Sequence, residues 1–274
     1  MWKIAFAAAF AACFGVFGAA QATDLSLKDT PDVEYEISPA WTGLYVGGHV
    51  GGAFGSIDVT DVFNYDGDPR ADNSFGTTGL ITGVQLGYNL QSGNFVFGVE
   101  ADLGYLNLSG DKTAALPRSK PNDKNTDISA TYSMDGGLYG DLTGRVGYAS
   151  GNTLLYLKGG AAFLEATLNS DYVGANCTTT SKCSPFNPST FAFENSETLF
   201  GWTLGFGVEY ALSSSWSLKL EYQHFDFGSM SSEYGGTFNF APKCKGCKPS
   251  ELTGNTDTDI SVDAVKVGLN YQFN

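Results

Sequence analysis

The sequence predicts an all-β protein in which eight antiparallel strands close into a barrel that crosses a membrane. Segments of about ten residues alternate apolar with small or polar side chains, which is the period of a strand. Strand endings on Tyr recur at intervals of about 60 residues, at Tyr88, Tyr148, Tyr210 and Tyr271, and a short turn follows each of the first three. Every charged residue within the cores of the predicted strands lies on the track opposite to the apolar one.

Residues 1–22 have the pattern of an export signal that is cleaved from the mature chain. Lys3 supplies the positive start, an apolar run rich in Ala, Phe and Gly follows, and Ala20-Gln-Ala22 predicts cleavage before Thr23. A membrane anchor is the alternative, but the run is short, poor in Leu and Ile, and not followed by a basic cluster. Cys13 raises a lipoprotein alternative, which the aromatic residue three positions before it disfavours.

Composition and charge exclude some partners. Without Lys3 the mature chain has 14 basic and 29 acidic residues, a net charge of −15. Such a surface argues against binding nucleic acid. The 35 glycines and 14% aromatic residues favour a β protein whose backbones approach closely. We expect residues 23–40 to be an acidic periplasmic lead-in and residues 41–274 to form the barrel.

The first four predicted strands cover residues 41–54, 77–90, 95–106 and 138–148. Each has aliphatic or aromatic side chains on one track, which we expect to face lipid, and Gly, polar or charged side chains on the other. The apolar tracks contain, in order, Leu44, Val46 and Val50; Leu80, Val84, Leu86 and Tyr88; Phe95, Phe97, Val99, Leu103 and Tyr105; and Leu142, Val146 and Tyr148.

The last four predicted strands cover residues 153–168, 200–212, 216–223 and 265–274 and follow the same scheme. Their apolar tracks contain Leu155, Leu157 and Phe163; Trp202, Leu204, Phe206, Val208 and Tyr210; Trp216, Leu218, Leu220 and Tyr222; and Val265, Val267, Leu269, Tyr271 and Phe273. The charged residues in the cores of the predicted strands fall on the inward track: Glu100, Asp102, Asp141, Arg145, Lys158, Glu209, Lys219, Glu221 and Lys266.

A soluble β-sandwich also alternates, with its apolar track in a core, and it is the main alternative fold. The connections favour the barrel, because short turns at 91–94, 149–152 and 213–215 alternate with predicted long loops. These loops cover residues 56–76, 109–129, 169–197 and 229–258. Short periplasmic turns and long extracellular loops are typical of outer-membrane barrels. Outward aromatic residues also gather beside the short turns, as in an interfacial girdle.

Three segments carry a family resemblance: Trp41-Thr-Gly-Leu-Tyr-Val-Gly-Gly48, Leu220-Glu-Tyr-Gln-His-Phe-Asp-Phe-Gly228 and Val267-Gly-Leu-Asn-Tyr-Gln-Phe273. Together they resemble the small porin-family outer-membrane proteins of alphaproteobacteria, which are related to the OmpA-like transmembrane barrel. The resemblance implies location in the bacterial outer membrane, contact with its lipid, and insertion by the barrel assembly machinery. Some members are surface antigens and some are described as haemin-binding. Asn274 departs from the family, whose members usually end on the aromatic residue.

The inward charges favour one of the two leading functions, a plugged barrel or a small-solute porin. Five acids and four bases in a narrow lumen are expected to pair with one another, which favours a plugged barrel with a structural or surface-interaction role. A small-solute porin with a narrow or gated conductance is the alternative. A lipid-modifying enzyme is a remote alternative, because the chain has only His49 and His224 and no nucleophile–base set at a recognisable spacing.

The four mature cysteines lie in the predicted long loops, at Cys177, Cys183, Cys244 and Cys247. Export through an oxidising compartment predicts disulfides, and local pairs close most easily, although three connectivities are possible. The lone Cys-x-x-Cys is a weak metal signal, so no metal is expected. Lys243, Lys245 and Lys248 surround it and could pair with the propionates of haemin, captured as a host or environmental surface ligand, although a solvated basic loop is the simpler interpretation.

Overall fold

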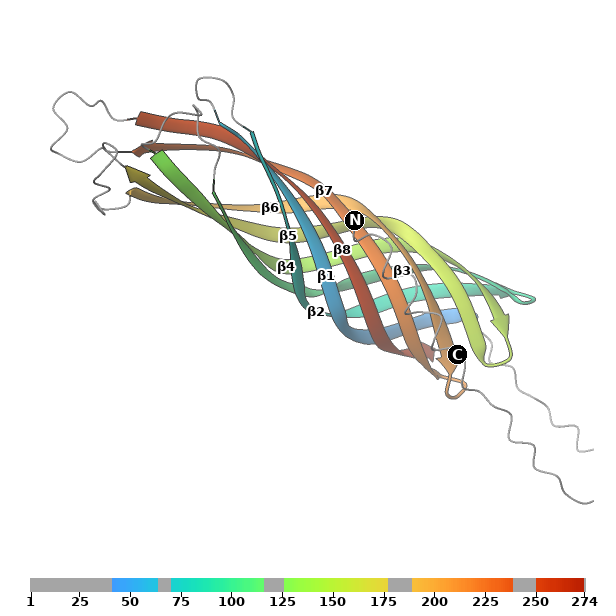
Figure 1. The fold of residues 1–274 in the computed structure, drawn as a ribbon. Coiled ribbons are helices and arrows are strands. Elements are labelled where there is room, and N and C mark those ends of the chain that lie inside the picture. Colours follow the sequence, from blue (N-terminus) through green and yellow to red (C-terminus); the bar gives the residue numbers. More distant parts are fainter. Residues whose placement is uncertain (1–40, 64–69, 116–125, 177–188, 239–249, 274) are drawn as a thin grey trace, which may run out of the picture. The chain divides into compact units, whose positions relative to one another are not determined.

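The computed structural model describes residues 41–63, 70–115, 126–176, 189–238 and 250–273, all within one compact unit (Figure 1). Each strand pairs antiparallel with the next, and β8 pairs with β1, so the eight strands form a closed barrel in chain order. This confirms the predicted fold. The strands are β1 (Gly43–Phe63), β2 (Arg70–Ser92), β3 (Phe95–Ala115), β4 (Thr126–Ser150), β5 (Thr153–Asn176), β6 (Ser189–Ala211), β7 (Trp216–Phe238) and β8 (Ser250–Phe273). The described residues include no helix long and apolar enough to cross a membrane.

Tight turns join three hairpins at one end of the barrel, where the sequence predicts them. Gly93 and Gly151 have φ values of 62° and 55°, a conformation that glycine adopts without the steric penalty of a side chain. The third turn has four serine-rich residues, 212–215, and the Ser213 Oγ accepts a hydrogen bond from the Trp216 amide at 3.1 Å. We call the half of the barrel next to these turns the turn-side half, and the other the far half.

The strands are much longer than expected. They have 21 to 25 residues each, whereas a tilted strand needs about 9–11 residues to cross a bilayer. The prediction of long loops over 56–76, 109–129, 169–197 and 229–258 was therefore wrong in extent, because β-structure continues into all four ranges. Between the strands lie residues 64–69, 116–125, 177–188 and 239–249, which are outside the described residues.

The outer face of the turn-side half is apolar. Side chains such as Leu80 and Leu142 are more than 60% exposed on it, which is unfavourable in water and favourable against lipid tails. Aromatic residues mark its lower edge, where Trp216 lies edge-on to Tyr271 with ring centroids 5.1 Å apart. Outward Trp202 and Phe200 mark its upper edge. The turn-side half thus has the apolar band and aromatic girdles of a membrane-spanning barrel.

The polarity of the two faces inverts in the far half, without a change of strand phase in β8. Below the inversion, β8 points Val265 and Val267 outward and buries Lys266. Above it, the same outward track contains Asp263 and acidic residues further along, whereas the inward track contains buried Ile260, Val262 and Ala264. The far half is therefore built like a water-soluble β protein, with an apolar interior and a polar exterior.

Two β-bulges maintain this facing. Between Gly136 and Tyr139, β4 has one residue more than β5, and its register with β3 shifts over the same stretch, between Tyr105 and Ser109 of β3. Between Asp226 and Ser229, β7 has one residue more than β8. Gly228 lies in the second bulge with a φ of 72°. A shift of one residue changes which track faces inward, so the inner face stays apolar directly on both sides of each bulge, with Tyr139 and Met134 in β4 and Phe227 and Met230 in β7. The bulge in β7 explains why the alternation of apolar and polar residues becomes irregular after His224.

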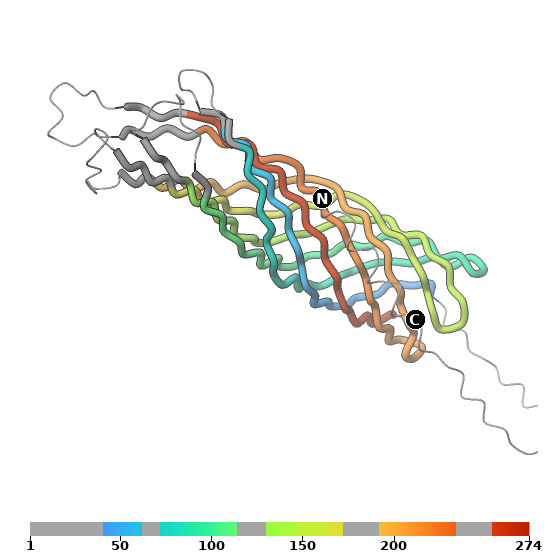
Figure 2. The backbone as a smooth tube through the Cα atoms, in the orientation of Figure 1, coloured from blue at the N-terminus to red at the C-terminus, as the bar shows by residue number. Residues whose placement is uncertain are grey.

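Two of the eight strand ladders stop part-way up the far half. The ladder between β2 and β3 ends at Thr78↔Ser109, and the ladder between β6 and β7 ends at Trp202↔Asp226. The other six continue close to the strand ends. The far half consequently divides into two four-stranded sheets, β7-β8-β1-β2 and β3-β4-β5-β6 (Figure 2). The sequence allowed a barrel or a β-sandwich. The turn-side half is a closed barrel, and the far half has the two facing sheets of a sandwich.

An apolar core fills the space between these two sheets. Ile57 and Ile260 come from one sheet, and Leu108 and Leu164 from the other; none is more than 1% exposed. Phe225 lies at the bottom, stacked on Phe227 with centroids 5.5 Å apart and edge-on to Tyr139 at 5.9 Å. Burial of each such side chain contributes about 1.5–3 kcal/mol to stability.

Candidate functional site: the barrel interior

The interior of the turn-side half holds all nine charged residues of the inward track, each at most 6% exposed. Glu100 on β3 lies at the centre of the group. Its carboxylate is 2.9 Å from Lys158 Nζ, 3.2 Å from Lys219 Nζ and 3.5 Å from Arg145 Nη1. The Tyr45 hydroxyl donates a further hydrogen bond to it at 2.7 Å. Side chains from four other strands, β1, β4, β5 and β7, thus meet at this buried carboxylate of β3.

Glu221 on β7 is a second centre. It lies 2.8 Å from Lys266 Nζ, 3.1 Å from Lys158 Nζ and 3.5 Å from Lys219 Nζ. The Tyr156 hydroxyl donates a hydrogen bond to it at 2.6 Å. Lys158 and Lys219 therefore bridge Glu221 to Glu100, so the ion pairs form one network and not separate pairs.

Arg145 extends the network towards the turns. Its guanidinium is 3.3 Å from Glu209 and donates to Asn89 Oδ1 at 2.8 Å, and its Cζ lies 4.6 Å from the centroid of the Tyr45 ring. Glu209 also accepts a hydrogen bond from Asn270 at 2.7 Å. A buried guanidinium is stable only when so matched, because an unpaired buried charge is costly.

Asp102 and Asp141 stand directly opposite each other on β3 and β4. Asp102 is 3.0 Å from Lys158 Nζ. Asp141 accepts a hydrogen bond from Gln223 at 3.0 Å, and no ion pair joins it to a basic group among the described residues. It is the fifth acid beside four bases.

The two histidines occupy different environments. His49 is buried in the lumen, where its ring nitrogens lie 2.6 Å from Gln85 Oε1 and 2.5 Å from the Tyr139 hydroxyl. His224 faces outward at the upper edge of the apolar band, 2.8 Å from Asp263 Oδ1, with its ring 5.4 Å from that of Trp202. The two rings belong to opposite faces of the barrel wall.

One acid is buried in the core of the far half. Asp61 is 0% exposed and accepts hydrogen bonds from the Tyr132 hydroxyl and, at 2.5 Å, from Thr256 Oγ1. β1 and β8 belong to one sheet and β4 to the other, so these bonds tie the two sheets together. Burial raises the pKa of Asp61, and the two hydrogen bonds offset part of that rise.

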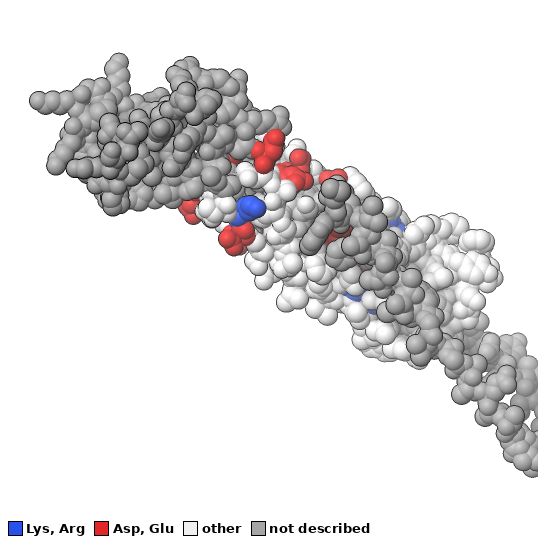
Figure 3. Space-filling view, viewed as in Figure 1, with Lys and Arg blue, Asp and Glu red and all other residues white. Residues whose placement is uncertain are grey.

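The solvent-exposed surface of the far half is strongly acidic. Of the described side chains that carry charge there, Lys112 is the one exposed base, against these exposed acids: Asp58, Asp72, Asp111, Asp135, Glu165, Asp171, Glu194, Glu197, Glu233, Asp257 and Asp259. Figure 3 shows red patches on this part of the surface and a broad white area over the lipid-facing part.

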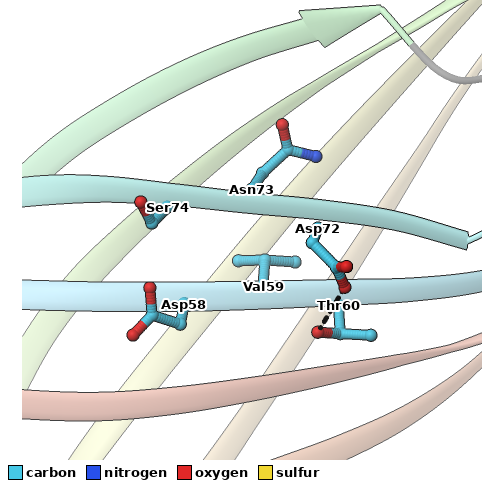
Figure 4. A pocket seen from close by; sticks show the side chains of 6 residues that line it. All are labelled: Asp58, Val59, Thr60, Asp72, Asn73 and Ser74. Atoms are coloured by element: carbon cyan, nitrogen blue, oxygen red, sulfur yellow. Dashed lines mark hydrogen bonds between the residues drawn. The ribbon is translucent and has the colours of Figure 1, made fainter.

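A shallow hollow of about 420 Å³ lies on this face between β1 and β2 (Figure 4). Asp58, Val59, Thr60, Asp72, Asn73 and Ser74 line it. Thr60 Oγ1 donates a hydrogen bond to Asp72 at 3.1 Å. Among the described residues no group of three or more His, Cys, Asp or Glu side chains is placed to hold a metal ion, and this hollow is no exception.

Comparison with known proteins identifies the family. A family model described as the outer membrane protein beta-barrel domain matches residues 9–273. The chain belongs to this family. The 31 kDa outer-membrane immunogenic protein of Brucella melitensis is 26% identical over 97% of this chain and 98% of its own length. A 22 kDa outer membrane protein of Rhizobium leguminosarum is 30% identical over 72% of this chain and 70% of its own length.

Among solved structures, OprG of Pseudomonas aeruginosa is similar, with a TM-score of 0.43, 15% identity, and coverage of 85% of this chain and 97% of that chain. The neisserial surface protein NspA has a TM-score of 0.35 at 12% identity, with coverage of 85% and 98%. The family match and the curated relatives make the protein an outer-membrane β-barrel related to outer-membrane immunogenic proteins, and its lipid-facing band lies in the bacterial outer membrane.

Several predicted site residues of this outer-membrane barrel lie outside the described residues. These are Cys177, Cys183, Cys244, Cys247, Lys243, Lys245, Lys248 and the cleavage site at Ala22 and Thr23. Phe191, Tyr234 and Phe238, which fall within the predicted long loops 169–197 and 229–258, belong to strands β6 and β7. Sequence reasoning missed the tyrosines that bond to the network and the apolar core above it.

Proposed function

We propose that this barrel is a closed, non-enzymatic outer-membrane protein that presents its far half as an interaction surface outside the cell. The observation that carries the proposal is that side chains occupy the interior at two levels, with the ion network below and the apolar core above. An eight-stranded barrel is just wide enough for side chains to fill. Because outer-membrane barrels place short turns in the periplasm, the far half belongs outside.

The experiment is planar-bilayer conductance of the refolded mature protein, with a known porin reconstituted from the same lipid as the positive control. We expect a barrel that inserts, as shown by a heat-dependent gel shift, but gives no sustained current steps. Discrete steps from inserted wild-type protein would contradict the proposal and support the small-solute porin.

Haemin capture is a second, narrower proposal, supported by family resemblance and by the chemistry of Lys243, Lys245 and Lys248. Cations suit propionates and aromatic side chains suit a macrocycle. Titration of haemin should shift its absorbance saturably for wild type and not for the triple Lys→Ala variant. Equal shifts for both proteins, or none for wild type, would exclude this loop as a receptor site.

The absence of catalysis is supported by the environment of His49, which is enclosed by Gln85 and Tyr139 and shielded from lipid and solvent. For assembly, we propose that the barrel assembly machinery recognises β8, whose outward Tyr271 and Phe273 rings lie 5.1 Å apart. Removal of Asn274 should then leave insertion equal or faster, as measured by the folded fraction on unboiled gels. Slower insertion would show that the terminal asparagine is required.

A further inference from the structure

The ladder between β6 and β7 ends at Trp202↔Asp226, although both strands continue well beyond that pair. Their outer neighbours stay paired over this stretch, β6 with β5 to Ser189 and β7 with β8 to Phe238. Two sheet edges therefore face each other. We call this the β6–β7 seam and define it by residues 192–201 of β6 and 227–233 of β7.

The seam is closed at its lower end and open above. At Gly201 the strands touch, since a Cβ built there would lie 1.8 Å from the Asp226 carbonyl oxygen. Higher up, a side chain spans the gap, with Asn195 Nδ2 donating to Ser232 Oγ at 2.5 Å. The bulge at Gly228 lies beside the point of divergence, and bulges of this kind end pairing and redirect a strand.

Solvent enters the seam. Glu197 has the inward parity of Leu199 and Thr203, which are both buried, yet Glu197 itself is exposed. The floor of the seam is apolar, with Leu199 and Met230 buried and Phe193 packed partly against the same core. The exposed rim is acidic, with Glu194 and Glu197 on β6 and Glu233 on β7.

Free sheet edges accept an added strand, whose backbone completes the ladder while alternate side chains meet opposite faces. Here an added strand would place aliphatic side chains over Leu199 and Met230, on the inner face, and basic side chains beside Glu194 and Glu233, on the outer face. A second copy of this chain is disfavoured as the occupant, because its own seam strands carry the same negative charge.

We propose that the β6–β7 seam binds an extended segment of another protein, with alternating basic and aliphatic residues, by strand addition. This inference rests on the proposed function, since the seam is reachable from outside only if the far half projects beyond the membrane. It specifies the partner chemistry that the interaction surface takes.

The test uses the full mature protein in detergent and a synthetic peptide of about ten residues that alternates Lys and Val. Hydrogen exchange should slow at residues 192–201 and 227–233 when the peptide binds. The same peptide with alternate backbone amides N-methylated keeps its side chains but loses ladder donors, so it should bind at least about ten-fold more weakly. Equal binding of both peptides would overturn strand addition.

Charge is tested by paired variants. Glu194→Gln/Glu233→Gln should weaken binding at least about ten-fold, whereas Asp58→Asn/Asp111→Asn, an equal charge change on exposed residues of β1 and β3, should not. Equal weakening by both pairs would mean general attraction to an acidic surface. Slowed exchange at the seam on concentrating the protein alone would identify a second copy as the occupant. Either result overturns the proposal.

The outcomes separate from those of the proposed function. A barrel that conducts and still shows the peptide response would refute the closed lumen only. A barrel that does not conduct and ignores the peptide would refute the seam only.

Discussion

Removal of the Glu221 charge should destabilise the barrel more than removal of the charge of Glu209 or Asp141. Glu221→Gln preserves the shape of the side chain but leaves Lys266 without a carboxylate within ion-pair distance, because Glu221 is its one ion-pair partner among the described residues. Lys158 and Lys219 keep Glu100. Leaving one buried charge uncompensated costs about 3–5 kcal/mol, so we expect a loss of that order in the free energy of unfolding.

Two matched variants calibrate this value. Glu209→Gln removes the same charge, but Arg145 retains Glu100 at 3.5 Å, and the amide oxygen can still accept from Asn270. We expect a loss of about 1–3 kcal/mol, the cost of one weakened buried charged hydrogen bond. Asp141→Asn breaks no ion pair and keeps an acceptor for Gln223, so its effect should be small.

The assay is urea unfolding of the three variants and wild type in lipid vesicles, followed by tryptophan fluorescence and by the gel shift of unboiled samples. The loss in the free energy of unfolding should be largest for Glu221→Gln, smaller for Glu209→Gln and smallest for Asp141→Asn. Equal unfolding midpoints for Glu221→Gln and Asp141→Asn would show that the lysines find solvent or other partners. The interior would then be wet and open, contrary to the network described.

Three further predictions concern the two halves of the wall and the far core. Leu204→Arg, on the lipid-facing part of β6, should cost roughly 2–4 kcal/mol of stability in vesicles. Thr198→Arg, on the same outward track above the apolar band, should cost little. Equal costs for the two variants would show that the membrane boundary does not lie between these residues. Phe225→Ala should lower the free energy of unfolding by about 3–5 kcal/mol, and a loss below about 1 kcal/mol would show a loosely packed core. Because burial raises the pKa of Asp61, its contribution is fully present below the ordinary Asp pKa and is lost as pH rises through the raised value. Unfolding midpoints should fall over that window in wild type and much less in Asp61→Asn, and parallel pH profiles would exclude Asp61 as the cause.

The turn-side half could be predicted from sequence because two independent signals coincide there. Apolar side chains such as Leu218 and Leu220 fill one track, while charges such as Lys219 and Glu221 fill the other. Both signals follow from the strand period alone, without any knowledge of which strands are neighbours. The glycines of the short turns are a third signal, because a residue pair such as Gly151-Asn152 favours a tight hairpin.

The far half could not be predicted by the same rule, because its faces are reversed. The segment Ser56-Ile-Asp-Val-Thr60 alternates as regularly as any strand, but its apolar residues lie on the inward track. A search for an outward apolar track therefore reads it as the start of a loop. The signal that could have found it is alternation regardless of polarity, with unchanged phase from Val50 through Asp58.

Partners within the lumen also lie beyond sequence reasoning. Lys219 and Glu100 are 119 residues apart in the chain and meet because the barrel closes. The strand register that brings them together depends on every hairpin between them. The alternation along each strand predicts which residues face inward, but it does not predict which carboxylate pairs with each basic residue.

In the closed barrel that we propose, the reversal of polarity along the strands gives the lumen two seals in series, one ionic and one apolar. The ionic seal weakens when salt or pH changes the charges, whereas the apolar seal above it responds to agents that dissolve hydrocarbon. A condition that loosens one leaves the other shut. Unlike a channel gated by a single ion pair, this barrel would leak only when both fail together, so the permeability barrier tolerates the loss of either.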